Sequence, residues 1–169
     1  MSGTEAETAV VEIEPVTSGD RLSYLKTLFV EYAEALEYDL CFEHFDRELD
    51  TLPGLYSPPD GNLWIARVDG AVAGCVALRR VIDLNDGMPA GEIKRLYVRP
   101  RFRGHSLGTR LIEAAIDFAR SGSYRRLLLD TVGGRMERAI GLYRGLGFRR
   151  TGRYYEGAPD GVDFYRLDL

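Results

Sequence analysis

The sequence predicts an α/β fold built on a single mixed, mostly antiparallel sheet. Residues 63–68 and 71–80 are strand-like runs on either side of an Asp-Gly dipeptide, which is a typical β-hairpin turn. An apolar and β-branched run at 93–98 leads through a loop into an amphipathic helix over 107–121 and then into a buried strand at 127–132. Such a unit pairs its two strands in parallel with a right-handed crossover, so one parallel pair joins otherwise antiparallel strands.

The N-terminal part of the chain supplies the outer elements. Residues 1–8 are mostly small or polar and are expected to be flexible. Residues 9–15 alternate apolar with acidic side chains, which predicts a first strand. An amphipathic stripe predicts a helix over about 19–37, and a shorter helix is expected over 43–50. Prolines and glycines in 52–62 then predict a loop before the hairpin.

The C-terminal part completes the sheet. A Gly-Gly pair after the buried strand frees the chain for a helix over 136–146, which Gly147 ends. Residues 149–155 and 162–169 are expected to close the sheet as strands around a proline-containing loop. The sequence has no internal repeat and no linker, so residues 9–169 are predicted to form a single domain.

Composition excludes several classes of protein. The 169 residues carry a net charge of −4, whereas a general nucleic-acid binder has a basic domain. Two cysteines, Cys41 and Cys75, make no disulfide framework, and Cys75 is expected to be a core thiol. No apolar run approaches about 18 residues, and residues 1–8 lack the pattern of a signal peptide. The chain is therefore predicted to be cytoplasmic, without a membrane partner.

The loop before the helix at 107–121 is the most informative stretch. Gly104 and Gly108 allow a tight turn, and three arginines precede the helix (Arg99, Arg101 and Arg103). A helix N-terminus exposes about four unpaired N–H groups and roughly half a positive charge, so it binds anions readily. The combination predicts a polyphosphate ligand, and an ordinary turn with a solvated basic rim is the alternative. Neither a Walker loop nor the dinucleotide fingerprint fits the glycine spacing.

Two motifs give the chain a family resemblance. Residues 103–108 resemble the pyrophosphate loop of the GNAT family of N-acetyltransferases, written Gln/Arg-x-x-Gly-x-Gly/Ala, and 92–100 resembles its fourth strand. Residues 139–148 resemble the second motif, Ala-x-x-Leu-Tyr-x-x-x-Gly-Phe. Ser106 replaces the middle glycine of the loop, where its hydroxyl would bond a phosphate oxygen or cap the helix. Met136 stands where many members have asparagine, so that contact with the cofactor is not carried over.

The resemblance implies the GNAT fold, with helices on both faces of the sheet, and acetyl-CoA as the acyl donor. The N–H groups of about 103–109 would cradle the pyrophosphate, and the three arginines would screen its charge. Backbone groups of Leu96 and Val98 would bond the pantetheine arm like an added strand, with an N–H near Val98 as the oxyanion donor. The implied cofactor-binding residues are Leu96, Tyr97, Val98, Arg99, Arg103, Gly104, His105, Ser106, Leu107, Gly108 and Thr109.

Direct acyl transfer also needs a base and an acid. The position of Glu92 matches the catalytic glutamate of several family members, and the alternative is a strand-end carboxylate in solvent. Tyr143 matches the family tyrosine and would protonate the departing thiolate, because a phenol of pKa about 10 is protonated at neutral pH. The alternative for Tyr143 is a core aromatic. The two histidines belong to no nucleophile motif, and no cluster has metal-ligand spacing, so no metal is expected.

The acceptor is the least determined part of the prediction. We expect its site between the first two helices, the 85–91 turn and the 154–161 loop, lined from Tyr32, Tyr38, Arg80, Tyr154 and Tyr155. A small amine or an amino-acid-like acceptor is preferred over a peptide. The competing functions are an acyl-CoA-binding module without catalysis and a nucleic-acid patch of surface arginines, which the acidic net charge argues against. The resemblance also leaves a homodimer open.

Overall fold

A mixed sheet lies at the centre of the molecule in the computed structural model, which describes residues 7–37, 40, 44–134 and 136–169. Within these residues, seven strands are ordered β1-β2-β3-β4-β5-β7-β6. The strands are β1 (Val11–Pro15), β2 (Asn62–Val68), β3 (Ala71–Asp83), β4 (Met88–Val98), β5 (Arg126–Val132), β6 (Arg149–Thr151) and β7 (Val162–Asp168). The α-helices in the same residues are α1 (Leu22–Leu36), α2 (Phe45–Thr51), α3 (Leu107–Ser121) and α4 (Glu137–Gly145).

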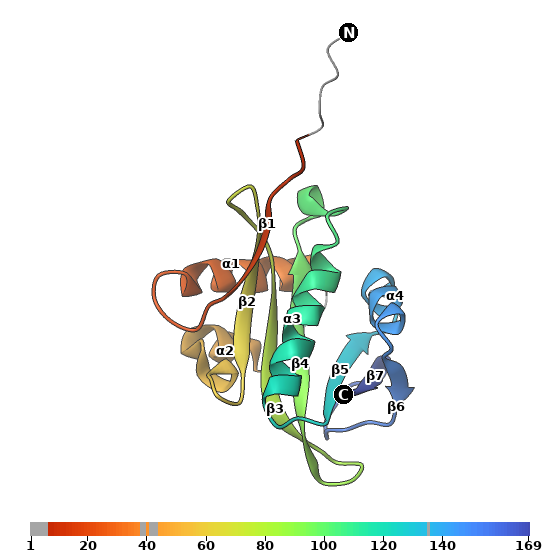
Figure 1. The fold of residues 1–169 in the computed structure, drawn as a ribbon. Helices are drawn as coiled ribbons and strands as arrows, with labels where there is room; N and C mark the ends of the chain where they lie inside the picture. The colour runs from red at the N-terminus through yellow and green to blue at the C-terminus, as the bar shows by residue number, and fades with distance from the viewer. Residues whose placement is uncertain (1–6, 38–39, 41–43, 135) are drawn as a thin grey trace.

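The pairing of the strands confirms the predicted sheet. β4 and β5 run parallel, and the other five pairings between described strands are antiparallel. Helices α3 and α4 cover one face of the sheet, and α1 and α2 cover the other (Figure 1). The α/β fold with helices on both faces, expected from the sequence, is therefore correct.

Alternation along the strands supplies a core on each face. Leu111 and Ile112 of α3 belong to the same buried cluster as Ile93 of β4. On the opposite face, Leu28 of α1 shares a cluster with Cys75 of β3, which is the core thiol that the sequence predicted. Each such leucine or isoleucine stabilises the fold by about 1.5–3 kcal/mol when fully buried. These two clusters pack the helices onto opposite faces of the sheet.

The parallel pair separates soon after it forms. β4 and β5 are paired at Gly91 with Leu127 and at Glu92 with Leu128, and beyond these residues the two strands diverge. In Figure 1 the end of β4 lies behind α3, whereas β5 runs toward α4. Within the described residues, the last part of β4 therefore has no partner strand on the side that faces β5.

A bulge in β4 determines which side chains near the end of this strand face the α3 layer and which face the α1 layer. Arg95 has a left-handed φ of 58°, and the register of β4 against β3 shifts at the same place. Beyond the bulge, Leu96 and Val98 pack with the α3 cluster, whereas Tyr97 packs with the α1 cluster.

Some predicted boundaries differ from the structure. The strand expected at 149–155 ends at Thr151, because the Leu84 N–H donates to the Tyr154 carbonyl (3.2 Å) and ties that segment to the β3–β4 hairpin. Helix α1 begins at Leu22 rather than at residue 19. Tyr38, Cys41 and residue 43 of the predicted second helix lie outside the described residues.

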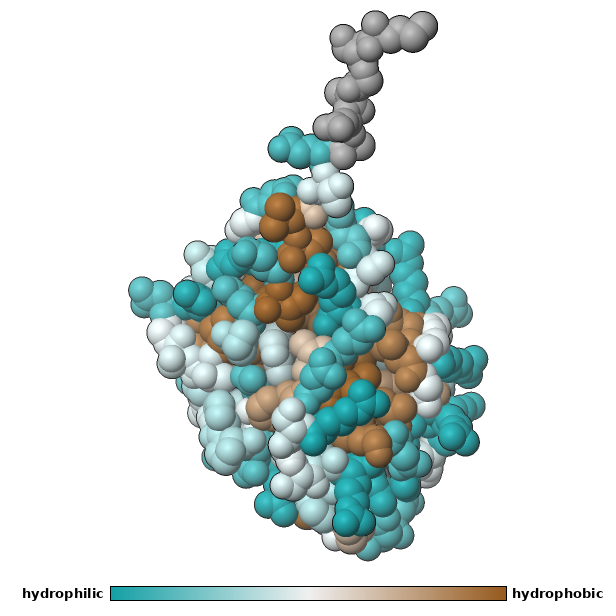
Figure 2. All heavy atoms as spheres, viewed as in Figure 1, coloured by the Kyte–Doolittle hydropathy of each residue, from teal (hydrophilic) through white to brown (hydrophobic). Residues whose placement is uncertain are grey.

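The surface mixes apolar and polar residues. Figure 2 shows hydrophilic side chains over much of the face that carries α3, with hydrophobic residues between them. The large hydrophobic residues with the greatest exposure are Leu55 (72%), Val10 (61%) and Leu84 (53%), which belong to separate segments. In the described part of the chain, no helix is both long enough and apolar enough to cross a bilayer.

Candidate active site

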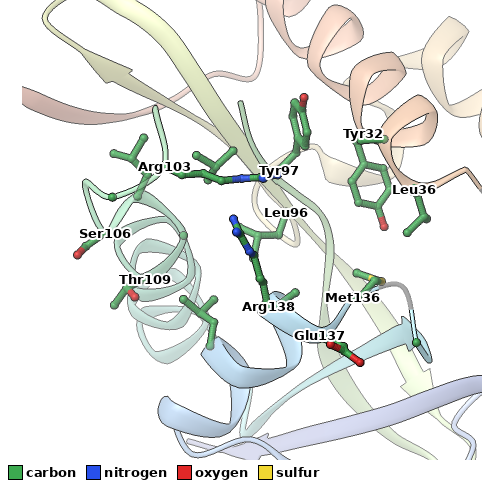
Figure 3. A pocket seen from close by; sticks show the side chains of 18 residues that line it. Tyr32, Leu36, Leu96, Tyr97, Arg103, Ser106, Thr109, Met136, Glu137 and Arg138 are labelled. Atoms are coloured by element: carbon green, nitrogen blue, oxygen red, sulfur yellow. The ribbon is translucent and has the colours of Figure 1, made fainter. Parts of the chain in front are cut away.

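A cavity of about 560 Å³ occupies the splay between β4 and β5. Its walls come from the end of α1, the end of β4, the loop before α3 with the first turn of that helix, and the start of α4 (Figure 3). The predicted cofactor-binding residues that line it are Leu96, Tyr97, Val98, Arg103, Gly104, Ser106, Leu107, Gly108 and Thr109. Arg99 and His105 belong to the same predicted set but do not line this cleft.

The loop at the N-terminus of α3 presents a row of unpaired amides. Gly104 (φ +96°) and Ser106 (φ +56°) are both left-handed, which turns successive N–H groups toward one side. Among the described residues, the N–H groups of 104–109 have no acceptor, and the next amide, that of Arg110, already donates to Ser106. The Arg103 N–H was expected in this row but donates to the Pro100 carbonyl (3.2 Å). The row is therefore an anion site of six amides at a helix N-terminus.

Gly108 has no structural reason to be a glycine. It lies within α3, where glycine is about 1 kcal/mol less favourable than alanine. A Cβ at this position would lie 3.5 Å from the Leu142 side chain, which is an ordinary contact. What the glycine provides is open backbone on the wall of the cleft, which suits the close approach of a ligand.

Ser106 does not cap α3. Its side chain makes no capping hydrogen bond, and Figure 3 shows that side chain pointing away from the space between Arg103 and Leu96. Of the two alternatives for the Ser106 hydroxyl, the helix cap is therefore wrong. The left-handed backbone explains the glycine of the family motif, because a Cβ is strained at positive φ.

The three loop arginines have different roles. Arg99 forms a bidentate ion pair with Glu31 of α1 (2.7 and 2.9 Å), and its Nη1 donates to the Val72 carbonyl (3.0 Å). The predicted role of Arg99 in charge screening is not supported by this placement. Arg101 lies over the Phe102 ring, 4.6 Å from its centroid. Arg103 alone of the three lines the cleft.

Arg138 of α4 is a second cation in the cleft that sequence reasoning missed. In Figure 3 the side chains of Arg138 and Arg103 extend into the same space from opposite walls. Arg138 lies four residues before Leu142 of the second motif, so both side chains lie on one face of α4. This spacing is the signal in the sequence that could have identified Arg138. Six amides and two guanidinium groups match the charge of a diphosphate.

The end of β4 offers backbone groups to the cleft. The Arg99 N–H donates to the Ala73 carbonyl of β3 (2.8 Å). Backbone groups alternate direction along a strand, so those of Val98 and Leu96 face away from β3 and into the splay. An extended ligand arm could pair with this edge as an added strand does.

Tyr143 lies behind the wall of the cleft rather than on it. Its ring is buried (3% exposed) and packs on Phe148 with centroids 5.7 Å apart. Burial raises the pKa of the hydroxyl far above its ordinary value, with smaller effects from Tyr32, Asp130 and Lys94.

Glu92 is buried, so the alternative of a solvated carboxylate is wrong. It is 1% exposed, and its two oxygens accept hydrogen bonds from Arg79 Nε and the Tyr154 hydroxyl, both at 2.6 Å. Burial and the Glu92 charge raise the pKa of the Tyr154 hydroxyl well above its ordinary value. Glu92 does not line the cleft.

The residues suggested for the acceptor separate into two groups. Tyr32 lines the cleft, and its hydroxyl points toward Met136 in Figure 3. Tyr155 donates to Asp130 (2.6 Å) at the inner end of the splay. The Tyr154 hydroxyl donates its hydrogen bond to Glu92, as described above. Arg80 is exposed and does not line the cleft. In the described part of the chain, no group of three or more His, Cys, Asp or Glu residues could hold a metal ion.

Comparisons with known proteins agree with this geometry. The family model described as the acetyltransferase (GNAT) family matches residues 24–148. An uncharacterised N-acetyltransferase of Schizosaccharomyces pombe is 34% identical over 94% of this chain and 95% of its own length. An N-acetylaspartate synthetase of Danio rerio is 30% identical over 81% of this chain and 44% of that protein. A GNAT acetyltransferase of Elizabethkingia anophelis, solved with acetyl-CoA bound, has a TM-score of 0.62 at 22% identity and covers 94% of this chain and 98% of its own.

Proposed function

The chain belongs to the GNAT family of acetyltransferases, and from this premise we propose that it transfers the acetyl group of acetyl-CoA directly to the amine of a small or amino-acid-like acceptor. The observation that carries the proposal is the row of six unpaired amides at residues 104–109, which faces a cleft that reaches α1 and α4. We also propose a cytoplasmic location, as the sequence predicts.

In the proposed complex the donor is held mainly by backbone. The amides of 104–109 bind the pyrophosphate, and Arg103 and Arg138 balance its charge from two walls. The pantetheine arm pairs with the free edge of β4 at Leu96 and Val98. The thioester carbonyl then lies near the Val98 N–H, which stabilises the oxyanion of the tetrahedral intermediate; loss of such a donor costs about 2.7–4 kcal/mol.

Two proton transfers complete the proposed reaction. The neutral amine attacks the thioester carbon, and the C–S bond breaks as the intermediate collapses. Tyr143 donates its phenolic proton to the departing thiolate, and its raised pKa keeps that proton in place until then. Glu92 is the proposed proton acceptor. Because both of its oxygens already accept hydrogen bonds, the proton reaches it through Tyr154 or a water rather than directly from the amine.

The acceptor class follows from two supports. The relative from Danio rerio carries the name N-acetylaspartate synthetase, which describes acetylation of an amino acid, although this chain covers less than half of that protein. The second is the lining of the inner end of the cleft by α1 and the start of α4, and we infer that a compact acceptor fits there better than a protein chain. Whether the chain forms a homodimer stays a prediction that light scattering would check.

The test is an acetylation screen. Acetyl-CoA and the chain are incubated with the standard amino acids, spermidine, histamine, 2-phenylethylamine and methylamine, and free thiol is measured. We expect acetyl-CoA binding by calorimetry and amine-dependent thiol release with at least one acceptor. Binding without release from any panel amine would support the second candidate, an acyl-CoA-binding module, which the placement of Glu92 and Tyr143 outside the cleft lining favours.

A further inference from the structure

Tyr32 lies at the inner end of the cleft. It lines the cleft together with Leu36 and Met136, and the same three residues line a second, smaller cavity that adjoins it. Asp130 of β5 and Val162 of β7 also line the small cavity. Its volume is about 20 Å³, and a water-sized group needs roughly 10–15 Å³, so the cavity has room for one such group. The position of the Tyr32 ring therefore limits the space for an acceptor in both cavities.

A buried arginine of β4 lies over the Tyr32 ring. The Arg95 side chain is 2% exposed, and its guanidinium carbon lies 5.8 Å from the centroid of the Tyr32 ring and 5.2 Å from that of Phe45 in α2. A cation over the face of an aromatic ring attracts it, and the attraction is stronger where water is excluded. Arg95 therefore holds an aromatic ring of each of the two helices, α1 and α2, that cover this face of the sheet.

Glu48 of α2 fixes the guanidinium of Arg95. The Nε and Nη2 atoms of Arg95 both donate to Glu48 Oε2 (3.0 and 2.8 Å), and Glu48 Oε1 accepts a hydrogen bond from the buried Tyr56 hydroxyl. Two donors on one planar group fix its orientation as well as its position. Arg95 thus connects Tyr32 to α2, although neither Arg95 nor Glu48 lines either cavity.

Stability alone does not explain an arginine at position 95. Its backbone is left-handed (φ 58°), which is strained for a residue with a Cβ. Apolar side chains of similar volume often stabilise a fold as well as a buried ion pair does, or better. Strained backbone is typical of functional sites, and here it coincides with a buried charge next to a residue of the cleft.

We propose that Arg95 is a positioning residue for the acceptor: held by Glu48, it fixes the Tyr32 ring where the cleft meets the small cavity. This inference rests on the proposed acetyl transfer and adds to it a residue that acts on the acceptor through Tyr32. The donor is bound by the amides of 104–109, which Arg95 does not hold. Loss of the guanidinium should therefore weaken amine binding and leave acetyl-CoA binding intact.

The first test compares two variants of the full chain that each break one buried ion pair. Arg95→Met removes the guanidinium and keeps a long side chain. Arg126→Met is the matched control, because Arg126 Nη1 pairs with the fully buried Asp83 (2.9 Å) and lines neither cavity. We expect both variants to unfold at lower urea concentration than the wild type. With the fastest panel amine, only Arg95→Met should raise the amine KM, by about fivefold or more, while acetyl-CoA affinity by calorimetry changes less than twofold.

The second test asks whether Arg95 acts through Tyr32. Tyr32→Ala removes the ring and should itself raise the amine KM. Adding Arg95→Met to Tyr32→Ala should raise the amine KM less than twofold further, because the ring on which the guanidinium acts is already absent. If the two single effects multiply in the double variant, Arg95 acts by another route and the proposal is overturned.

A third variant removes the ion pair without leaving a buried charge. Glu48→Leu, Tyr56→Phe and Arg95→Met together replace the pair and its hydroxyl partner by apolar side chains, an exchange that often preserves or raises stability. We expect this triple variant to fold and to show the same rise in the amine KM. A wild-type amine KM in the folded triple variant overturns the positioning role and leaves the acetyl transfer standing. A wild type that transfers acetyl to no panel amine overturns both proposals.

Discussion

Removing the Tyr143 hydroxyl tests the proposed chemistry with little disturbance of the fold. Tyr143→Phe keeps the ring, which packs on Phe148 in the α3-side core. No described residue hydrogen-bonds its hydroxyl, so the substitution breaks no bond and should change the free energy of unfolding by less than about 1 kcal/mol. A general acid contributes roughly 10²–10⁴-fold to a rate. We therefore expect kcat to fall about 10²-fold or more, which corresponds to at least about 2.7 kcal/mol of transition-state stabilisation.

The assay is thiol release with the best panel amine, with urea melts on the same samples. Tyr165→Phe is the matched control, because Tyr165 is also buried (1% exposed) in the cluster that holds Tyr143. We expect both variants to fold with near wild-type stability and only Tyr143→Phe to lose kcat, with both KM values unchanged. A kcat for Tyr143→Phe within threefold of the wild type would refute the acid role.

The pH profile provides an independent check on Tyr143. An acid catalyst loses activity as pH rises through its own pKa. Burial raises the pKa of this hydroxyl far above the ordinary tyrosine value near 10, so the wild-type kcat should show no loss up to about pH 10. A fall in kcat with a midpoint at or below pH 10, in enzyme that remains folded, would contradict the assignment.

Further predictions concern the loop and the buried carboxylates. Arg103→Gln should weaken acetyl-CoA binding about tenfold by calorimetry, whereas Arg99→Gln should leave affinity within twofold, because its guanidinium is held by Glu31. Ser106→Gly should leave the affinity for acetyl-CoA unchanged, and a clear loss of that affinity would contradict the prediction. The same substitution should alter the free energy of unfolding by less than about 1 kcal/mol, because relief of the strain at the left-handed residue offsets the greater freedom of the unfolded chain. The hydrogen bond from Arg99 lowers the pKa of Glu31 in the folded protein. The ion pair therefore stabilises the fold fully at pH values above the pKa of Glu31 in the unfolded chain, near 4.3, and this stabilisation is lost as pH falls through the pKa of Glu31 in the folded protein. The stability gap between the wild type and Arg99→Gln should therefore be constant from pH 6 to 8 and narrow below pH 4. Glu92→Gln should lower kcat at least tenfold with acetyl-CoA affinity unchanged, and an unchanged kcat would leave Glu92 a structural carboxylate.

The sheet and the donor loop could be predicted because their signals are local. The hairpin turn, the strand at 93–98 and the amphipathic helix after the loop each show within about a dozen residues of sequence. An anion site made of backbone amides depends on the turn and the helix start, and not on distant partners. Even there, the sequence left two roles open for the Ser106 hydroxyl, a phosphate contact or a helix cap, because a left-handed backbone at a serine has no local sequence signal.

The charged residues could not be predicted because their partners are distant. Arg99 and Arg103 look equivalent in sequence, yet Glu31, which holds Arg99, lies 68 positions away. Glu92 looks like a strand-end carboxylate until the hairpin brings in Arg79 and the last loop brings in Tyr154. The periodicity of a sequence identifies which residues are buried, but it does not identify which residue of opposite charge pairs with a buried or half-buried charged side chain.

This contrast indicates where substrate preference is encoded. The donor end of the cleft is built mainly from residues 96–109, with Arg138 added from α4, so substitutions at the other end of the cleft leave it intact. The proposed acceptor end combines Tyr32 of α1, Asp130 of β5 and Met136 before α4, so it is not contained in a single motif. Exchange of one side chain at this junction changes the volume of a cavity that holds one water-sized group, without changing any amide that holds the donor. Acceptor preference can therefore diverge while the donor site is retained. A variant at Val162, which lines this cavity and not the donor cleft, should change the preferred amine and leave acetyl-CoA affinity unchanged.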